Sequence, residues 1–351
     1  MRNMIKTNIE AFNNICKQLF ELSQIKTETG RRYFSTTEEE KKWLIETNIS
    51  GVEFFLPSIR AFNLEFNGLK YIAVIGANMQ NFNEDPSILL VTELNSGLIT
   101  LLISEGLLKI NPTANLLEFD DNIMSQHKDA DYKGHDYFEI LSYLEPIKLF
   151  QITENSILKD ENLYRILVYI YSNNPNYLIL EFNKFVLETF TEISLVGSKN
   201  ISYNLLLHSL LSTNFKHSFL ELYRLVERLF PINYLKDFHE RVDTKLNFIE
   251  FSSELENITS WRPREEDALE KIFSIAKQNT KNSFDNFQKS NPNLQNQSDY
   301  KYFYKLRNSI VHFRSSHEEF KLNSEQWNLL IIATLTLIDE QYSFYNKILE
   351  E

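Results

Sequence analysis

The segment between Phe62 and Ile75 limits the fold of this chain more than any other part of the sequence. Residues 62–66 alternate apolar and polar side chains, and residues 69–75 form a largely apolar run. Only Asn67 and Gly68 stand between the two runs, and this pair readily supplies the positive φ angles of a type I′ turn. Two strand patterns joined by such a turn predict a β-hairpin, and therefore an antiparallel sheet.

The sequence around this hairpin predicts a small, mostly antiparallel sheet over roughly residues 50–125. Four further apolar runs are expected to add strands to it: Ile88–Leu94, Leu98–Ile103, Leu107–Ile110 and Leu116–Phe119. The turn residues Asn95, Ser96 and Gly97 separate the first two of these runs. Before the sheet, apolar residues recur at helical spacing over residues 1–23, which predicts an amphipathic helix.

After residue 136, apolar residues recur mainly at helical spacing. The helices expected from this spacing are Tyr137–Glu145, Asn162–Tyr171, Asn176–Phe190, Phe215–Phe230, Pro263–Ala276, about 300–317, and a last helix capped by Asn323 and Gln326. The polar stretch 279–299 is expected to be a long loop or irregular connector. Residues 197–200, Gly-Ser-Lys-Asn, predict a break between two helical sets.

These patterns predict an α+β protein with two domains. Residues 1–200 would form a mixed domain with a small antiparallel sheet, and residues 201–351 an all-α helical bundle. A chain of 351 residues is long enough to bury two cores.

The cysteine count and the lengths of the apolar runs indicate the compartment in which the protein is expected. The single cysteine, Cys16, excludes an intrachain disulfide and a cysteine-based zinc site, and fits a reducing compartment. Residues 1–20 mix polar and apolar side chains, unlike a signal peptide. The longest apolar run, Leu329–Ile338, is too short to span a bilayer and suits a buried helix. We therefore expect a soluble protein of the cytoplasm with no membrane partner.

The net charge of −12 argues against a general coat for nucleic acids, because lysine and arginine drive nonspecific binding. Residues 205–351 carry 18 basic and 21 acidic side chains, whereas residues 1–204 carry 18 and 27. The C-terminal part therefore tolerates RNA better. Any RNA site there must be a local cleft and not a whole-surface field.

Residues 307–312 concentrate polar chemistry within a helical pattern. Arg307 offers a planar fork of donors suited to phosphate, and His312 supplies an imidazole, the kind of side chain that moves protons in catalysis. Asn308 can orient either group or a ribose hydroxyl. At about 100° per residue, Leu306, Ile310 and Phe313 should face the core, while the polar trio faces solvent or a partner.

The string Arg307-Asn308-x-x-x-His312 resembles the R-N-x-x-x-H signature of the HEPN superfamily of helical RNases. The resemblance covers about residues 205–351, and this string is its only specific motif. It implies a metal-independent endoribonuclease that needs no cofactor and leaves a 2′,3′-cyclic phosphate and a 5′-hydroxyl. It also implies that two motif helices meet across a homodimer interface.

The resemblance further implies a toxin of a toxin–antitoxin pair or an effector of abortive antiviral defence, with tRNA or mRNA as substrate. The N-terminal domain would then detect a trigger or dock a regulatory protein. Two alternatives remain open. The C-terminal domain could be a non-catalytic HEPN-like interaction module or antitoxin-like partner. Alternatively, the N-terminal domain could be an enzyme of unknown type joined to a helical dimerisation domain.

Other polar residues are assigned weaker roles. Arg314 could add a phosphate contact, and His317 a second proton carrier. Glu221 or Glu227 could pair with Arg307 and hold it in place. The patch 127–136, with two histidines and three aspartates, has metal-binding groups, but its spacing fits a solvated loop better. The sequence contains no phosphate loop, no G-x-S-x-G elbow and no H-E-x-x-H pair, which disfavours ATPase, serine hydrolase and zinc protease chemistry.

Overall fold

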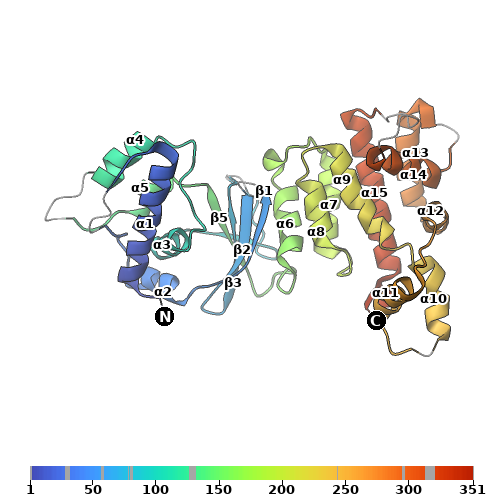
Figure 1. Cartoon of the computed structure of the whole chain (residues 1–351), viewed down its shortest axis with the longest axis horizontal. Coiled ribbons are helices and arrows are strands. Elements are labelled where there is room, and N and C mark those ends of the chain that lie inside the picture. Colours follow the sequence, from blue (N-terminus) through green and yellow to red (C-terminus); the bar gives the residue numbers. More distant parts are fainter. Residues whose placement is uncertain are drawn as a thin grey trace. The chain divides into compact units, whose positions relative to one another are not determined.

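A computed structural model of the protein describes residues 2–27, 32–56, 59–77, 79, 82–125, 132–242, 244–294, 297–312 and 321–350. The chain divides into two compact units, Met1–Leu163 and Tyr164–Glu351. The first combines helices with an antiparallel sheet, and the described residues of the second form helices (Figure 1). The predicted α+β class is therefore confirmed.

The boundary between the units falls before the position that the Gly-Ser-Lys-Asn turn suggested. That turn does end a helix, α7 (Lys184–Val196), but α7 packs against α15 (Ser324–Phe344) in the second unit. The Asn328 side chain of α15 fixes this contact. Its Oδ1 accepts from the backbone N–H of Asn183 at 2.7 Å, and its Nδ2 donates to the carbonyl of Glu181 at 3.1 Å.

The described residues of the first unit form a five-stranded antiparallel sheet with the strand order β1-β2-β3-β5-β4. The strands are β1 (Asn48–Leu56), β2 (Ile59–Phe66), β3 (Leu69–Ile75), β4 (Leu90–Thr92) and β5 (Ile147–Ile152). The predicted hairpin is confirmed: Phe66 pairs with Leu69, and the φ angles are 52° at Asn67 and 74° at Gly68. β5 was not predicted, and of the run Ile88–Leu94 only β4 is a strand.

The strand predictions for the three later runs were wrong. Leu98–Ile103 lies in a helix, α3 (Ser96–Ser104), and Leu116–Phe119 forms a short helix, α4. Leu107–Ile110 contributes only an isolated bridge between Ile110 and Leu144. α3 is buried on all sides from Ser96 to Ile103. Its run from Leu98 to Ile103 is apolar except for Thr100, and therefore lacks the periodicity that marks a helix. The Asn95 side chain, which accepts from the Leu98 N–H at 2.9 Å, starts the helix.

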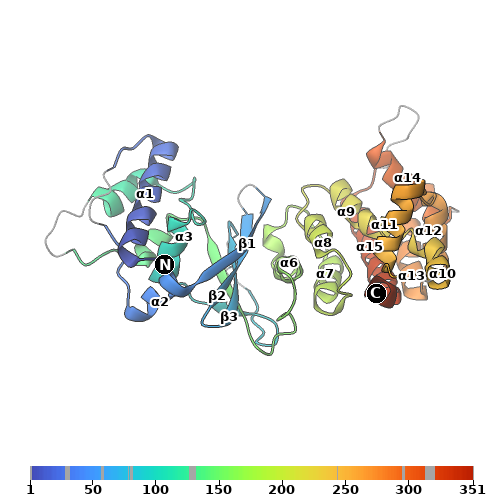
Figure 2. The ribbon, with the colours of Figure 1, turned by 60° about the horizontal axis from the view of Figure 1, so that its bottom comes forward.

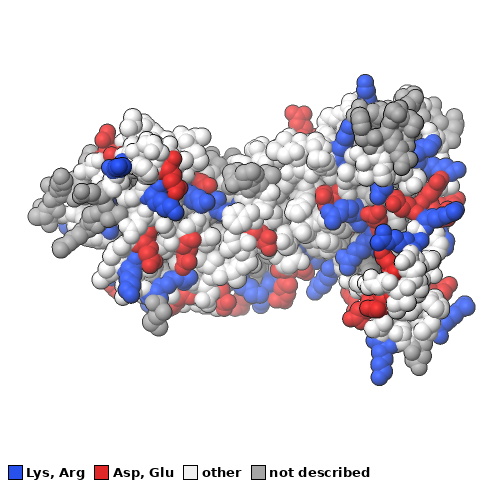
Figure 3. Space-filling view, in the orientation of Figure 1, with Lys and Arg blue, Asp and Glu red and all other residues white. Residues whose placement is uncertain are grey.

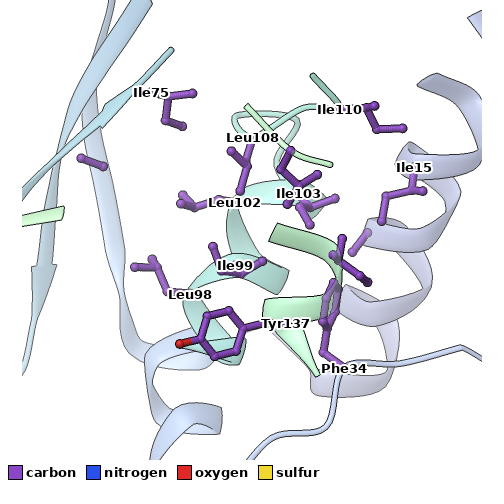
Figure 4. Packing of buried hydrophobic residues seen from close by; sticks show 14 of the residues in the cluster. Ile15, Phe34, Ile75, Leu98, Ile99, Leu102, Ile103, Leu108, Ile110 and Tyr137 are labelled. Carbon is purple, nitrogen blue, oxygen red and sulfur yellow. The ribbon is translucent and has the colours of Figure 1, made fainter. Parts of the chain in front are cut away.

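Helices cover one face of the sheet (Figures 1 and 2). They are α1 (Met4–Ser23), α2 (Glu38–Glu46), α3, α4 and α5 (Tyr137–Leu141), with a π-helical turn at Asp120–Ser125. Alternate residues of β2, Phe62, Leu64 and Phe66, point into the same hydrophobic cluster as Ile15 of α1. α1 packs against α3, and Figure 4 shows Ile15 of α1 pointing toward Ile103 of α3. The predicted first helix is therefore confirmed as α1, which supplies one wall of the core.

The turn of the hairpin supports a stability prediction. Gly68 has a φ of 74° with no atom within 4 Å of an added Cβ, so Gly68→Ala should cost only its backbone strain, about 1 kcal/mol of unfolding free energy. Asn67→Gly in the same turn is the matched control, because glycine also tolerates the φ of 52° at that position. Urea unfolding would measure both. An unchanged midpoint for Gly68→Ala would contradict the prediction.

The second unit is a set of packed helices. Its described helices are α6 (Leu163–Ser172), α7, α8 (Tyr203–Leu210), α9 (Phe215–Glu227), α10 (Ile232–Arg241), α11 (Phe248–Thr259), α12 (Glu265–Ser274), α13 (Gln278–Ser290), α14 (Asp299–Val311), α15 and α16 (Asn346–Glu350), with single 3₁₀ turns at Pro175–Tyr177 and Pro292–Leu294. The predicted cap of α15 is confirmed. Asn323 Oδ1 accepts from the Gln326 N–H at 2.9 Å, and Gln326 Oε1 accepts from the Asn323 N–H at 3.0 Å.

The prediction of a loop over residues 279–299 was wrong, because α13 occupies most of this segment. The sequence of α13 is rich in Asn, Gln and Lys, which obscures its narrow buried stripe. That stripe consists of Thr280, Phe284 and Phe287, spaced at one and two helical turns. The Thr280 hydroxyl donates to Glu340 of α15, and the rings of Phe284 and Phe287 lie beside Tyr302 of α14. Over the described ranges, no helix combines the length and apolarity that a bilayer crossing requires.

Candidate functional site

The R-N-x-x-x-H string lies at the C-terminal end of α14, and its histidine follows the last helical residue. Tyr302, Phe303 and Leu306 are buried and fix the helix against its neighbours α9 and α12. His312 is the first residue beyond the helix, with φ −106° and ψ 99°, and its N–H donates to the Asn308 carbonyl at 2.9 Å. The helix therefore stops inside the motif instead of running on to residue 317. Phe313, Arg314 and His317 lie outside the described residues.

Arg307 lies in a half-buried polar cluster, the Arg307 cluster, which consists of Arg307, Asn308, Tyr223, Glu227 and Glu265. The Arg307 side chain is only 16% exposed. Its Nη1 donates to Asn308 Oδ1 at 2.9 Å and lies 3.4 Å from Glu265 Oε2, while its Nη2 lies 3.5 Å from Glu227 Oε1. The guanidinium carbon lies 5.5 Å from the centre of the Tyr223 ring, within reach of a cation–π interaction.

This placement corrects the expected orientation of the polar trio. A helical wheel put Arg307 away from the apolar stripe of α14, but α9 and α12 pack there and cover it. His312 is exposed as expected, and Asn308 is intermediate. Within the described parts of the chain, the His312 side chain makes no hydrogen bond or ion pair with Arg307 or Asn308.

The charge of the Arg307 cluster is unbalanced, because two carboxylates face one guanidinium. Burial raises the pKa of Glu227, the Arg307 guanidinium opposes this shift, and the neighbouring Glu265 adds to it. Burial also raises the pKa of Tyr223 well above its usual range, so this phenol stays protonated. Among the described residues, the Tyr223 hydroxyl has no hydrogen-bond partner, and Glu265 Oε2 has none beyond its ion pair with Arg307. The cluster therefore retains polar groups that a water, a substrate or a second chain could satisfy.

The two glutamates predicted as partners of Arg307 make different ion pairs. Glu227 does pair with Arg307, whereas Glu221 pairs with Arg224 at 3.0 Å on the surface of α9. Glu265 and Tyr223 were not expected at the site. The one available signal was that Tyr223 lies four residues before Glu227, and so on the same face of a helix. Glu265 begins α12 and gave no comparable signal.

The patch at 127–136 falls partly outside the described residues, which resume at Tyr132. In the described part, His135 is buried and its ring lies 5.8 Å from that of Phe12, while Asp136 caps α5 through the Phe138 N–H at 3.0 Å. These contacts are structural. Across the described ranges, no group of three or more histidine, cysteine, aspartate or glutamate side chains is placed to hold a metal ion.

Basic and acidic side chains are intermingled over the helices of the second unit (Figure 3). A phosphate bound there would be held by particular side chains and not by a broad positive field. Comparison of the chain with protein-family models, with curated proteins and with solved structures gave no match. Its function is therefore inferred from the site itself.

Proposed function

We propose that this protein is a metal-independent endoribonuclease of the HEPN type. The observation that carries the proposal is the hydrogen bond of 2.9 Å that fixes the Arg307 guanidinium to Asn308, with the exposed His312 immediately beyond the end of the same helix. A fixed guanidinium and a titratable imidazole are the two groups that phosphodiester cleavage without metal needs. Asn308 is assigned the role of holding Arg307 in register.

In the proposed reaction, His312 takes the proton from a ribose 2′-hydroxyl, and the 2′-oxygen attacks the adjacent phosphorus. The bond from phosphorus to the 5′-oxygen breaks, and the leaving oxygen receives a proton from an imidazolium. Arg307 stabilises the negative charge that builds on the phosphoryl oxygens. The products are a 2′,3′-cyclic phosphate and a 5′-hydroxyl, so atoms and protons balance without an oxidant or a metal.

We propose further that the active site is completed by a second copy of the chain. Support comes from His312, which is exposed and makes no hydrogen bond with Arg307 among the described residues, and from the Tyr223 hydroxyl, which has no hydrogen-bond partner among them. In a homodimer, two motif helices could bring two histidines and two arginines to one phosphate. The proposed biological setting is the cytoplasm, as a toxin or antiviral effector, with the first unit as trigger detector or dock for a regulatory protein.

The nuclease assay would incubate the purified protein with tRNA and total RNA, with and without EDTA. Cleavage should survive EDTA, and His312→Ala should lower its rate by at least about 100-fold, the usual contribution of a general acid or base. His208→Ala is the matched control, because His208 is also an exposed histidine of the second unit and lies on α8. Cleavage that persists in His312→Ala, or that EDTA abolishes, would exclude the proposed chemistry.

A non-catalytic HEPN-like interaction module is the second candidate. The observation that favours it is that both Nη atoms of Arg307 already face carboxylates, so a phosphate must compete with Glu227 and Glu265. Fluorescence titration with labelled, uncleavable 2′-deoxy RNA analogues separates the two candidates. A nuclease should bind the analogue, and bind it more tightly as a Glu227→Gln/Glu265→Gln double variant. An interaction module should bind it in neither form.

A further inference from the structure

The Tyr223 hydroxyl is a buried polar group of the Arg307 cluster that the proposed reaction does not use. The Tyr223 side chain is only 1% exposed. Its hydroxyl has no hydrogen-bond partner among the residues that the structure describes. Nearly all buried polar side-chain groups in folded proteins make a hydrogen bond, whether to the protein, to water or to a ligand. An unpaired hydroxyl beside a candidate catalytic arginine therefore points to a partner from another molecule.

Aromatic contacts fix the position of this hydroxyl. The Tyr223 ring stacks on Phe303 of α14, with ring centres 5.2 Å apart and an angle of 26° between the planes. Phe230 meets the Tyr223 ring edge to face, with centres 6.4 Å apart and an angle of 88°. Both arrangements are favoured by the charge distribution of aromatic rings. Because the hydroxyl oxygen lies on the axis of the ring, these contacts hold it in place without any hydrogen bond of its own.

The fixed hydroxyl lies close to the charges of the Arg307 cluster. The guanidinium carbon of Arg307 lies 5.5 Å from the centre of the Tyr223 ring. Burial is the largest cause of the raised pKa of Tyr223, and the charge of Glu265 raises this pKa further. Arg307 opposes the shift, and Glu227 adds to it. The phenol is therefore an O–H donor at neutral pH, and it sits beside the guanidinium that would bind a phosphate.

The two carboxylates beside Arg307 are accessible to solvent, so an incoming anion can replace them. The side chain of Glu265 is 31% exposed and that of Glu227 is 38% exposed. Their oxygens lie 3.4 and 3.5 Å from the Nη atoms of Arg307, which is long for a hydrogen bond. A phosphate presents the same kind of anionic oxygen. One that displaced Glu265 from Nη1 would come to lie near the Tyr223 hydroxyl, because Glu265 is the carboxylate whose charge acts on Tyr223 most strongly.

We propose that Tyr223 is a further catalytic residue of the nuclease site, whose hydroxyl donates a hydrogen bond to a non-bridging phosphoryl oxygen while Arg307 binds the same phosphate. This inference rests on the proposed function, since it assigns a role within that reaction. Tyr223 transfers no proton and forms no covalent bond. Its hydrogen bond strengthens as negative charge builds on the phosphoryl oxygen, because hydrogen bonds to charged acceptors are stronger than those to neutral ones.

Tyr223→Phe removes the hydroxyl and keeps the ring with its packing. We expect kcat/KM for tRNA cleavage to fall at least about tenfold, the loss expected for one hydrogen bond to a charged group. The midpoint of urea unfolding should stay the same or rise slightly, because a buried hydroxyl without a partner is removed. A role confined to structure would lower the unfolding midpoint instead.

Tyr171→Phe is the matched control for this variant. Tyr171 lies on α6 in the same unit and is fully buried. Its hydroxyl also lacks a hydrogen-bond partner within the described part of the chain. The same change of chemistry at this position should therefore affect unfolding in the same way and leave kcat/KM unchanged.

Phosphorothioate substrates test whether the hydroxyl touches the reacting phosphate. Sulfur replaces one of the two non-bridging oxygens at the cleaved bond of a short RNA, and it is a weaker hydrogen-bond acceptor than oxygen. The wild-type protein should cleave one of the two diastereomers at least about tenfold more slowly than the oxygen substrate. Tyr223→Phe should largely abolish this difference, because the contact that sulfur weakens is already missing.

The possible results separate this inference from the nuclease proposal. An unchanged kcat/KM for Tyr223→Phe, or the same effect of sulfur on the variant and the wild type, would overturn the role of Tyr223 and leave the nuclease proposal standing. Weaker self-association of Tyr223→Phe in analytical ultracentrifugation, with an unchanged effect of sulfur, would assign the hydroxyl to a contact with the second copy. No cleavage of any RNA by the wild-type protein would overturn the nuclease proposal and this inference with it.

Discussion

Phe303→Ala should lower the free energy of unfolding of the second unit by about 4 kcal/mol, within the range for removing a buried phenylalanine. Phe303 is fully buried at the centre of an aromatic cluster. Its ring centre lies 5.2 Å from that of Tyr223, 5.3 Å from Phe219, 5.6 Å from Phe273 and 5.7 Å from Phe284. Alanine at this position would leave a void that rings from α9, α12 and α13 border and cannot readily fill.

Urea unfolding followed by far-ultraviolet circular dichroism measures this loss. Phe303→Leu should cost less than half as much, because leucine keeps most of the buried volume. Phe185→Ala is the matched control: Phe185 is 68% exposed on α7, and its removal should change stability by less than about 0.5 kcal/mol. A loss below about 1 kcal/mol for Phe303→Ala would show that the aromatic cluster does not hold these helices together.

Arg307→Ala should also destabilise the second unit, by about 2 kcal/mol. Removing one member of a fully buried ion pair costs about 3–5 kcal/mol, because the remaining charge is left uncompensated. The expected loss is smaller here, since Glu227 is 38% exposed and Glu265 is 31% exposed, so water partly screens both. The two carboxylates would face each other without a cation between them.

A triple variant separates this structural role from catalysis. Arg307→Ala combined with Glu227→Gln and Glu265→Gln should regain most of the lost stability, because no unpaired charge remains. The same variant should still fail to cleave RNA if Arg307 stabilises the transition state. Recovery of both stability and cleavage would show that Arg307 is not a catalytic residue. Unchanged stability of the Arg307→Ala variant would contradict the ion-pair argument.

Local signals were sufficient for parts of the fold. The β2–β3 hairpin was predictable because Asn67 and Gly68 determine its turn without help from the rest of the chain. The same holds for the start of α15, where Asn323 and Gln326 satisfy each other's backbone groups. In both places the deciding contacts lie within four residues of sequence.

The predictions for α3 and α13 were wrong because of how much of each helix is buried. α3 is covered on every side and shows no polar face, so its apolar run read as a strand. α13 is the opposite case, since its buried stripe is narrow and its remaining surface is polar. Hydrophobic periodicity marks a helix only when the helix lies at the boundary between core and water.

The candidate site was predictable only in part, because some of its residues come from helices that lie far from residues 307–312 in the sequence. The string 307–312 identified Arg307, Asn308 and His312, and the suggestion that Glu227 pairs with Arg307 agrees with the structure. Tyr223 and Glu265 reach Arg307 only because α9 and α12 pack against α14, and the sequence of one helix does not reveal its neighbours. That packing is also why Arg307 is covered although it lies off the apolar stripe.

The irregular first strand of the sheet has a consequence for self-association. β1 lies at an edge, and its pairing with β2 shifts register between Ser50 and Glu53 and again between Phe54 and Leu56. Gly51, with a φ of 61°, lies within the first irregularity. A strand from another molecule would need an even row of free N–H and C=O groups to continue the ladder, and this edge presents an interrupted one. The bends in β1 thus work against the growth of fibrils by edge-to-edge strand addition.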